Sequence, residues 1–208
     1  MTRLHAGLAL AVTALLVAVS VWAAFFRGAN DAFAACRSGS TAGADIGGPF
    51  SLIDENGAAV TDKDVLTKPS LVYFGYAFCP DVCPVDNGRN ADAVDLLDQM
   101  GVEVTPVFIS IDPKRDTPAA LADFTDALHP RMIGLTGSPD QIRAASMAYK
   151  TYYKVQNPDD EYYLVDHSTF TYLMLPGVGF AEFFKRDATA EAMAETVACF
   201  VRAMPPAN

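Results

Sequence analysis

From residue 70 onward, short apolar runs typical of buried strands alternate with amphipathic segments typical of helices. Residues 70–76 and 104–111 are rich in β-branched and aromatic side chains, which favours buried strands. The pattern between them predicts a helix over residues 92–100 that stops at Gly101. Because strands and helices alternate in this order, we expect an α/β domain with a mixed sheet flanked by helices.

Capping signals in the sequence predict where two of the helices begin. Thr117 followed by Pro118 marks one helix start, and the capping box from Ser138 to Gln141 marks another. Further predicted elements are an N-terminal hairpin near residues 50–53 and 59–61, a strand at 131–136, a polar loop at 156–161, a hairpin of 168–175 and 180–184, and a final helix at about 189–204. This order fits a thioredoxin-like fold for one domain, residues 46–208.

The N-terminal part predicts a membrane anchor. Residues 6–26 carry no charge and are long enough to span a bilayer as a helix, which takes about 20 residues. We expect a tail at 1–5, a transmembrane helix at 6–26 and a linker at 27–45. A cleaved signal peptide is the alternative, because Ala32-Phe33-Ala34 has the small-x-small form of a cleavage site.

The charge of the chain restricts its partners. The formal net charge is −10, so the domain repels phosphate backbones and nucleic acid is excluded as a partner. An acidic domain suits cationic partners and metal ions. Because an N-terminal apolar segment of this kind directs export, we expect the domain on the extracytoplasmic side, in a bacterial periplasm or a mitochondrial intermembrane space.

Cys79 and Cys83 are the informative pair among the four cysteines. They follow the first long strand and precede a helix that Pro84 can begin, and sites in open α/β sheets are built at such junctions. The helix start favours thiolates, so we expect both sulfurs to ionise readily. At i and i+4 on a helical turn they are close enough to share a metal or to form a disulfide.

A histidine that could be a third ligand favours metal binding over a disulfide at Cys79 and Cys83. His167 lies at the entry to a predicted strand, and in a thioredoxin-like topology this loop lies beside the Cys79 turn, which favours it as the third ligand. His5 precedes the predicted anchor, and His129 is interpreted as a solvated or helix-capping side chain. Two thiolates and one imidazole form an open, soft site that suits Cu(I), zinc or Cu(II).

The other two cysteines lie far apart in the sequence. Cys199 is flanked by apolar residues in the final helix and is interpreted as a small buried side chain. Cys36 can pair with Cys199 or stay free, and the sequence offers no physical basis for choosing. Asp81 and Asp166 flank the predicted ligands and are at most their neighbours.

Several ordered blocks of sequence resemble the Sco/SenC family, copper-binding assembly factors for cytochrome c oxidase. The resemblance covers about residues 46–203. It rests on residues 48–52, 73–76, 79–84, 108–113 with Arg115 and Asp116, 134–137, 149–153 and 165–167. The chain departs from the family pattern at residues 85–88 and in the turn at 175–179, and the first departure could alter the partner surface.

The resemblance implies a membrane-anchored thioredoxin-like domain that carries copper, as Cu(I), Cu(II) or both, on Cys79, Cys83 and His167. The implied partners are cytochrome c oxidase subunit II, whose binuclear copper A centre the family serves, and other copper chaperones. The alternative is a periplasmic thiol–disulfide oxidoreductase or peroxide reductase that uses Cys79 and Cys83 as redox thiols. Such an enzyme more often has two residues between its cysteines, and it gives His167 no clear role.

Overall fold

The domain is built around one seven-stranded sheet in a computed structural model that describes residues 5, 12–22, 32–37 and 45–205. The labelled elements are β1 (Ser51–Asp54), β2 (Ala59–Thr61), α2 (Asp62–Val65), β3 (Ser70–Gly75), α3 (Val82–Gln99), β4 (Thr105–Ser110), α4 (Pro118–Asp126), β5 (Ile133–Thr136), α5 (Pro139–Ala148), β6 (Tyr153–Val155), β7 (Val165–His167), β8 (Thr171–Leu175), β9 (Gly179–Phe184) and α6 (Ala190–Arg202).

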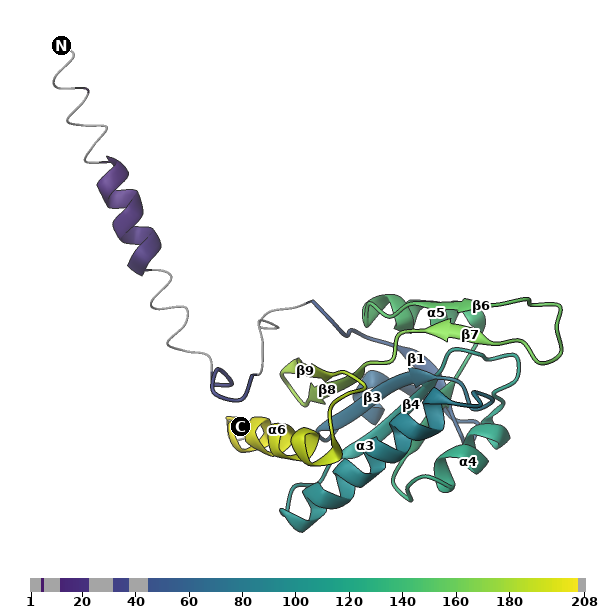
Figure 1. Cartoon of the computed structure of the whole chain (residues 1–208). Coiled ribbons are helices and arrows are strands. Elements are labelled where there is room, and N and C mark those ends of the chain that lie inside the picture. Colours follow the sequence, from purple (N-terminus) through teal and green to yellow (C-terminus); the bar gives the residue numbers. More distant parts are fainter. Residues whose placement is uncertain (1–4, 6–11, 23–31, 38–44, 206–208) are drawn as a thin grey trace.

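The sheet is mixed, as predicted. Its strand order is β2-β1-β5-β4-β3-β8-β9. The three central strands β3, β4 and β5 run parallel, whereas β1 and β8 pair antiparallel with them on either side. Helices α3 and α6 lie together on one side of the sheet and α5 lies on the other (Figure 1). The parallel strands are joined by crossover helices, α3 between β3 and β4 and α4 between β4 and β5.

Alternation along β3 places its side chains on two faces. Tyr73 points toward α3, where its hydroxyl donates to Asp86, whereas the next ring, Phe74, packs 5.1 Å from Tyr149 at the end of α5. Every residue of β3 is buried. The strand therefore belongs to the centre of the core, and its carboxyl end delivers the chain to the cysteine segment.

Helix α3 is longer than the sequence pattern predicts. The pattern places a helix over residues 92–100 and a separate helical start at Pro84, but one continuous helix begins at Val82 and ends at Gln99. The sequence pattern does not indicate the first part of α3, because Asp86 and Asn87 are polar and yet buried. Their tertiary partners, and not an apolar stripe, hold this part against the sheet.

The structure contains a second, two-stranded sheet that the sequence pattern does not predict. β6 and β7 pair antiparallel, with Tyr153 opposite His167, and they flank the predicted polar loop. Helix α5, which the capping box at Ser138 predicts, ends at Ala148, and the chain turns at Lys150, whose φ is 55°. Three-residue strands give too short a pattern to recognise from sequence.

The N-terminal part is described only in pieces. Residues 12–22 are helical and exposed, and the remainder of the predicted anchor at 6–26 lies outside the described residues. None of the helices described for this chain has the length and apolar character needed to cross a membrane. Residues 32–37 form a turn, and Cys36 makes a disulfide bond with Cys199 of α6. Cys199 is thus half-buried and bonded, where a small buried thiol was expected.

Candidate metal centre

The segment between β3 and α3 brings Cys79 close to Cys83. Cys79 precedes the helix, and its backbone N–H donates to the Tyr76 carbonyl at 3.2 Å. Cys83 lies in the first turn of α3, fully buried, and its own N–H donates to the Cys79 sulfur at 3.5 Å. The two sulfurs are thus brought together by a turn and a helix start, and not by one helical turn as expected. Neither is in a disulfide.

Gly75, the last residue of β3, makes room for this arrangement. A Cβ atom at this position would lie 2.9 Å from the Cys83 sulfur and 2.9 Å from the Tyr73 ring. Real Cβ atoms do not approach that closely, so a larger residue would displace the sulfur. The glycine is required here by close approach and not by backbone conformation.

The two thiols differ in acidity. A hydrogen bond from the Cys83 thiol, together with the backbone N–H groups of Cys83 and Asp81, outweighs burial and lowers the pKa of Cys79 to about 4. The hydrogen bond to Cys79 and burial raise the pKa of Cys83. The expectation that both sulfurs ionise readily is therefore wrong for Cys83, because its thiol proton is held in the hydrogen bond to Cys79 and burial disfavours its thiolate.

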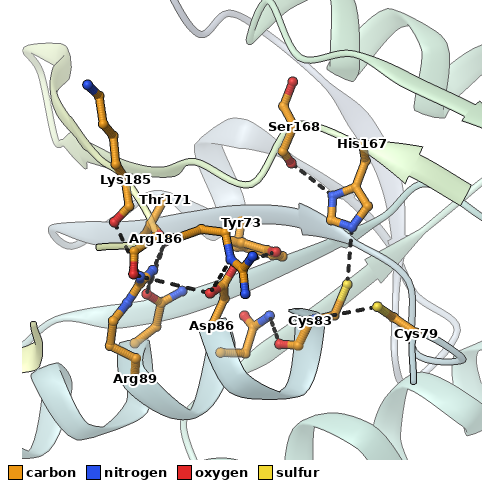
Figure 2. A network of polar contacts seen from close by, with 12 residues as sticks. Tyr73, Cys79, Cys83, Asp86, Arg89, His167, Ser168, Thr171, Lys185 and Arg186 are labelled. Carbon is orange, nitrogen blue, oxygen red and sulfur yellow. Dashed lines mark hydrogen bonds and ion pairs between the residues drawn. The ribbon is translucent and has the colours of Figure 1, made fainter. Parts of the chain in front are cut away.

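His167 reaches the cysteines from β7. Its Nε2 lies 3.4 Å from the Cys83 sulfur, and its Nδ1 lies 2.8 Å from the Ser168 carbonyl (Figure 2). A carbonyl oxygen only accepts, so Nδ1 carries the proton and leaves Nε2 with its lone pair toward the sulfurs. The ligand atoms of Cys79, Cys83 and His167 all lie within 4.8 Å of one another. The structure thus brings all three predicted residues together.

Aromatic rings enclose the imidazole. Tyr73 and Tyr76 meet His167 edge-on, with ring centroids 6.1 and 5.9 Å away. The Tyr76 hydroxyl also accepts the backbone N–H of Val165 on β7, at 3.4 Å. These contacts restrict the rotation of the histidine ring, which is what a preformed ligand site needs.

The loop between β4 and α4 connects the two ligand-bearing segments. Asp116 accepts the backbone N–H of Ala77, two residues before Cys79, at 2.9 Å. Asp112 accepts the hydroxyl of Tyr163, just before β7, at 2.6 Å. Arg115 pairs with Asp112 and lies 3.6 Å from the centre of the Tyr163 ring. In the sequence, Asp112, Arg115 and Asp116 stand out only as part of the family resemblance, because their partners lie far along the chain.

Burial raises the pKa of the Asp116 carboxyl to about 6, even though Ser110 and Ala77 both donate to it. One of its oxygens is buried without a partner among the described atoms. Burial in the loop therefore disfavours the ionised form of the Asp116 carboxyl.

A second group of possible ligands does not form a comparable site. His129 lies near Asp95 and Asp98, but it is buried, and its Nδ1 accepts the N–H of Arg131 at 3.1 Å. The proton of a neutral ring is then on Nε2, 3.6 Å from Asp95, so no lone pair is left for a metal. Both carboxylate oxygens of Asp98 accept a hydrogen bond from Nη2 of Arg131. Of the two interpretations of His129, a solvated or a helix-capping side chain, the first is wrong because the side chain is buried.

The aspartates that flank the ligands stay outside the centre. Asp81 is the residue before α3 and makes no capping hydrogen bond with its side chain, and Asp166 is exposed beside His167. In β7 successive side chains point to opposite faces, so Asp166 points away when His167 points inward. The donor set is thus two sulfurs and one imidazole nitrogen, which favours soft metal ions.

Known proteins resemble this chain over most of its length. A family model described as SCO1/SenC matches residues 38–202. Protein SenC of Rhodobacter capsulatus is 58% identical over 200 residues, 94% of this chain and 90% of that protein. Protein SCO1 homolog 1, mitochondrial, of Arabidopsis thaliana is 41% identical over 170 residues, 81% of this chain and 51% of that protein.

Among solved structures, Arabidopsis thaliana ScoI with copper bound has a TM-score of 0.72 and 40% sequence identity. The match covers 76% of this chain and 99% of that one. The thioredoxin-like arrangement expected from the order of elements is thereby confirmed.

Proposed function

The chain belongs to the SCO1/SenC family, and on this premise we propose that it is a copper-carrying assembly factor for cytochrome c oxidase. In this proposal Cys79, Cys83 and His167 hold the copper ion. The observation that carries it is the convergence of two thiols and one correctly oriented imidazole within 4.8 Å. A related structure with copper bound, at 40% identity, supports the choice of metal.

The donor set suits a metal that is passed on. Thiolates and imidazole together accept Cu(I) and Cu(II), whereas structural zinc usually has four protein ligands. In the described part of the chain, this group includes no fourth His, Cys, Asp or Glu. An incoming ligand of an acceptor protein can therefore bind the ion before the three donors release it. We propose the binuclear copper A centre of oxidase subunit II as the acceptor, as the family resemblance implies.

The difference in acidity supports a second use of the same pair. The Cys79 thiolate can attack an acceptor disulfide, giving a mixed disulfide and releasing one acceptor thiolate. Cys83 then gives its proton to the released acceptor thiolate and attacks Cys79, which leaves a Cys79–Cys83 disulfide and frees the second acceptor sulfur as a thiolate. This reaction would prepare acceptor cysteines for copper, and it is the thiol–disulfide oxidoreductase alternative.

The proposed location is the extracytoplasmic side of a membrane. The Cys36–Cys199 disulfide supports it, since such bonds persist in oxidising compartments. The uncharged segment at residues 6–26 is the proposed anchor. The Arabidopsis relative is named as mitochondrial, so either a periplasm or an intermembrane space is compatible with the family.

The site assignment is tested by metal binding. The full chain in detergent is loaded anaerobically with Cu(I), and bound copper is measured for wild type, Cys79→Ser, Cys83→Ser and His167→Ala. We expect one copper per wild-type chain and at least about 100-fold weaker binding in each variant, because each loses a direct ligand. His129→Asn is the matched control, since its amide oxygen can still accept the N–H of Arg131.

The outcomes separate the two functions. Wild-type affinity in His167→Ala would remove this residue from the ligand set. A wild type that binds no copper but rapidly reduces the disulfide of a subunit II fragment would favour the oxidoreductase. If it does both, with copper binding lost on oxidation of Cys79 and Cys83, one pair of thiols serves both steps.

A further inference from the structure

Helix α3 carries a line of buried polar side chains that continues from the copper site. Cys83, Asp86, Asn87 and Asn90 are all buried, and their spacing places them on one face of the helix. Asn87 donates from Nδ2 to the Cys83 carbonyl at 2.8 Å, within the helix. Asp86 and Asn90 instead reach across to the sheet. The departure from the family pattern at residues 85–88 therefore lies partly in the interior.

Asp86 and Asn90 of α3 each accept a hydrogen bond from a side chain of the sheet. The Tyr73 hydroxyl of β3 donates to Asp86 Oδ2 at 3.0 Å, and the Thr171 hydroxyl of β8 donates to Asn90 Oδ1 at 3.0 Å. Tyr73 and Thr171 are direct partners in the β3–β8 ladder, so their side chains share one face of the sheet. Neighbouring points on the sheet are thus joined to successive turns of the helix, as Figure 2 shows.

On both sides of these two bridges, in the helix and in the sheet, a bridging residue lies close in sequence to a proposed copper ligand. Cys83 lies one helical turn before Asp86 in the same continuous helix. His167 is separated from Thr171 only by residues 168–170. A shift of α3 along the sheet would therefore change the distance between the Cys83 sulfur and His167 Nε2.

Two arginines complete the network. Arg186 donates from Nε to Asp86 Oδ1 at 3.3 Å, which compensates the buried charge. Arg89 donates to Thr171 and Asn90 at 3.3 and 3.4 Å, and to the carbonyls of Lys185 and Arg186 at 3.2 and 2.9 Å. Hydrogen bonds of this kind are directional, whereas apolar packing is not, so they fix the register of the helix on the sheet.

We propose that the Tyr73–Asp86 and Thr171–Asn90 bridges are positioning pairs for the copper site. They hold the Cys83 sulfur 3.4 Å from His167 Nε2 and thereby set copper affinity and ligand geometry. Asp86, Asn90 and Thr171 do not bind the metal themselves. This inference rests on the proposed function and deepens it, because it names what keeps the two halves of the site in register.

Thr171→Val tests the proposal, because it keeps the shape of the side chain and removes only the hydroxyl. Cu(I) affinity is measured by competition with a chromophoric chelator, and the Cu(II) form by its thiolate charge-transfer absorption and electron paramagnetic resonance. We expect about tenfold weaker binding and a changed Cu(II) spectrum. Thr171→Ser, which retains the hydroxyl, is expected to behave as wild type.

Thr125→Val is the matched control. Thr125 is equally buried and donates to the Leu121 carbonyl within α4, away from the metal site. We expect this change to lower Tm without altering affinity or spectrum. If Thr171→Val likewise lowered Tm alone, the bridge would be merely structural and the inference would be wrong.

A second variant and a measurement on metal-free protein cover the cases in which Thr171→Val does not fold or the wild type binds no Cu(I). If Thr171→Val does not fold, Asn90→Leu with Thr171→Val removes the donor and the acceptor of the bridge together, while Arg89 keeps its hydrogen bonds to the Lys185 and Arg186 carbonyls, and the same changes in affinity and spectrum are expected. If the wild type binds no Cu(I), the proposed function fails. The inference is then decided by the ¹⁵N shifts of the His167 ring in metal-free protein: a change in Thr171→Val supports it, and unchanged shifts overturn it.

Discussion

Cys79 and Cys83 are chemically identical residues whose surroundings give them different acidities. Cys79 receives hydrogen bonds from the Cys83 thiol and from backbone N–H groups at the start of α3, which stabilise its thiolate. Cys83 is more deeply buried, and its pKa is raised by Cys79 and by burial. The metal-free protein therefore holds one thiolate and one thiol at neutral pH. A bound copper ion would remove the second proton, because only the thiolate is a ligand.

The acidity of Cys79 gives a prediction at the scale of one residue. The ultraviolet absorbance of its thiolate, obtained as the difference between wild type and Cys79→Ser, should appear at about pH 4. In Cys83→Ala the transition should move to higher pH, because the largest stabilising hydrogen bond is lost. A transition at the ordinary pKa of a thiol in wild type would contradict the structure.

At the scale of elements, the loop from β4 to α4 supports both segments that carry ligands. It contacts the β3–α3 segment through Ala77 and the segment before β7 through Tyr163. Asp116, which makes the first of these contacts, has a pKa raised by burial to about 6. Because its pKa is higher in the folded than in the unfolded state, it stabilises the fold most below about pH 4, and this contribution is lost as pH rises through about 6.

Asp116→Asn should remove this pH dependence, since an amide does not ionise. The free energy of unfolding of wild type relative to the variant should fall by up to about 3 kcal/mol between about pH 4 and about pH 7. Urea unfolding of both proteins at the two pH values measures the difference. A difference that does not change with pH would show that Asp116 titrates at its ordinary value.

Local signals in the sequence predicted much of the fold. The caps at Thr117 and Ser138 are present as predicted, and the buried strands β3 and β4 lie where apolar runs placed them. The cysteine pair and His167 were found from residue type and expected topology. What the sequence could not show depends on contacts between distant residues: the β6–β7 pairing, the burial of His129 and the choice of partner for Cys36.

At the scale of the whole molecule, the Cys36–Cys199 disulfide joins residues 32–37 to the last helix. The bond closes a separation of 163 residues, which spans almost the whole domain. Phe33 is buried beside it, with its ring 5.4 Å from that of Phe200, and Arg37 lies over both rings. The segment before the domain is thus held by both a covalent bond and apolar packing.

Removing this disulfide should destabilise the domain without changing its site. Cys36→Ser with Cys199→Ser is expected to lower the free energy of unfolding by about 3–5 kcal/mol, because a long closed loop restricts the unfolded chain most. Copper affinity should stay at the wild-type value, since neither residue belongs to the metal centre. Phe33→Ala, with the disulfide intact, should cost less, because the bond still restricts the unfolded chain when the ring is lost. Urea unfolding and copper competition on the three proteins measure both quantities. A loss of copper affinity in the double variant would show that the segment at residues 32–37 supports the site as well as the fold.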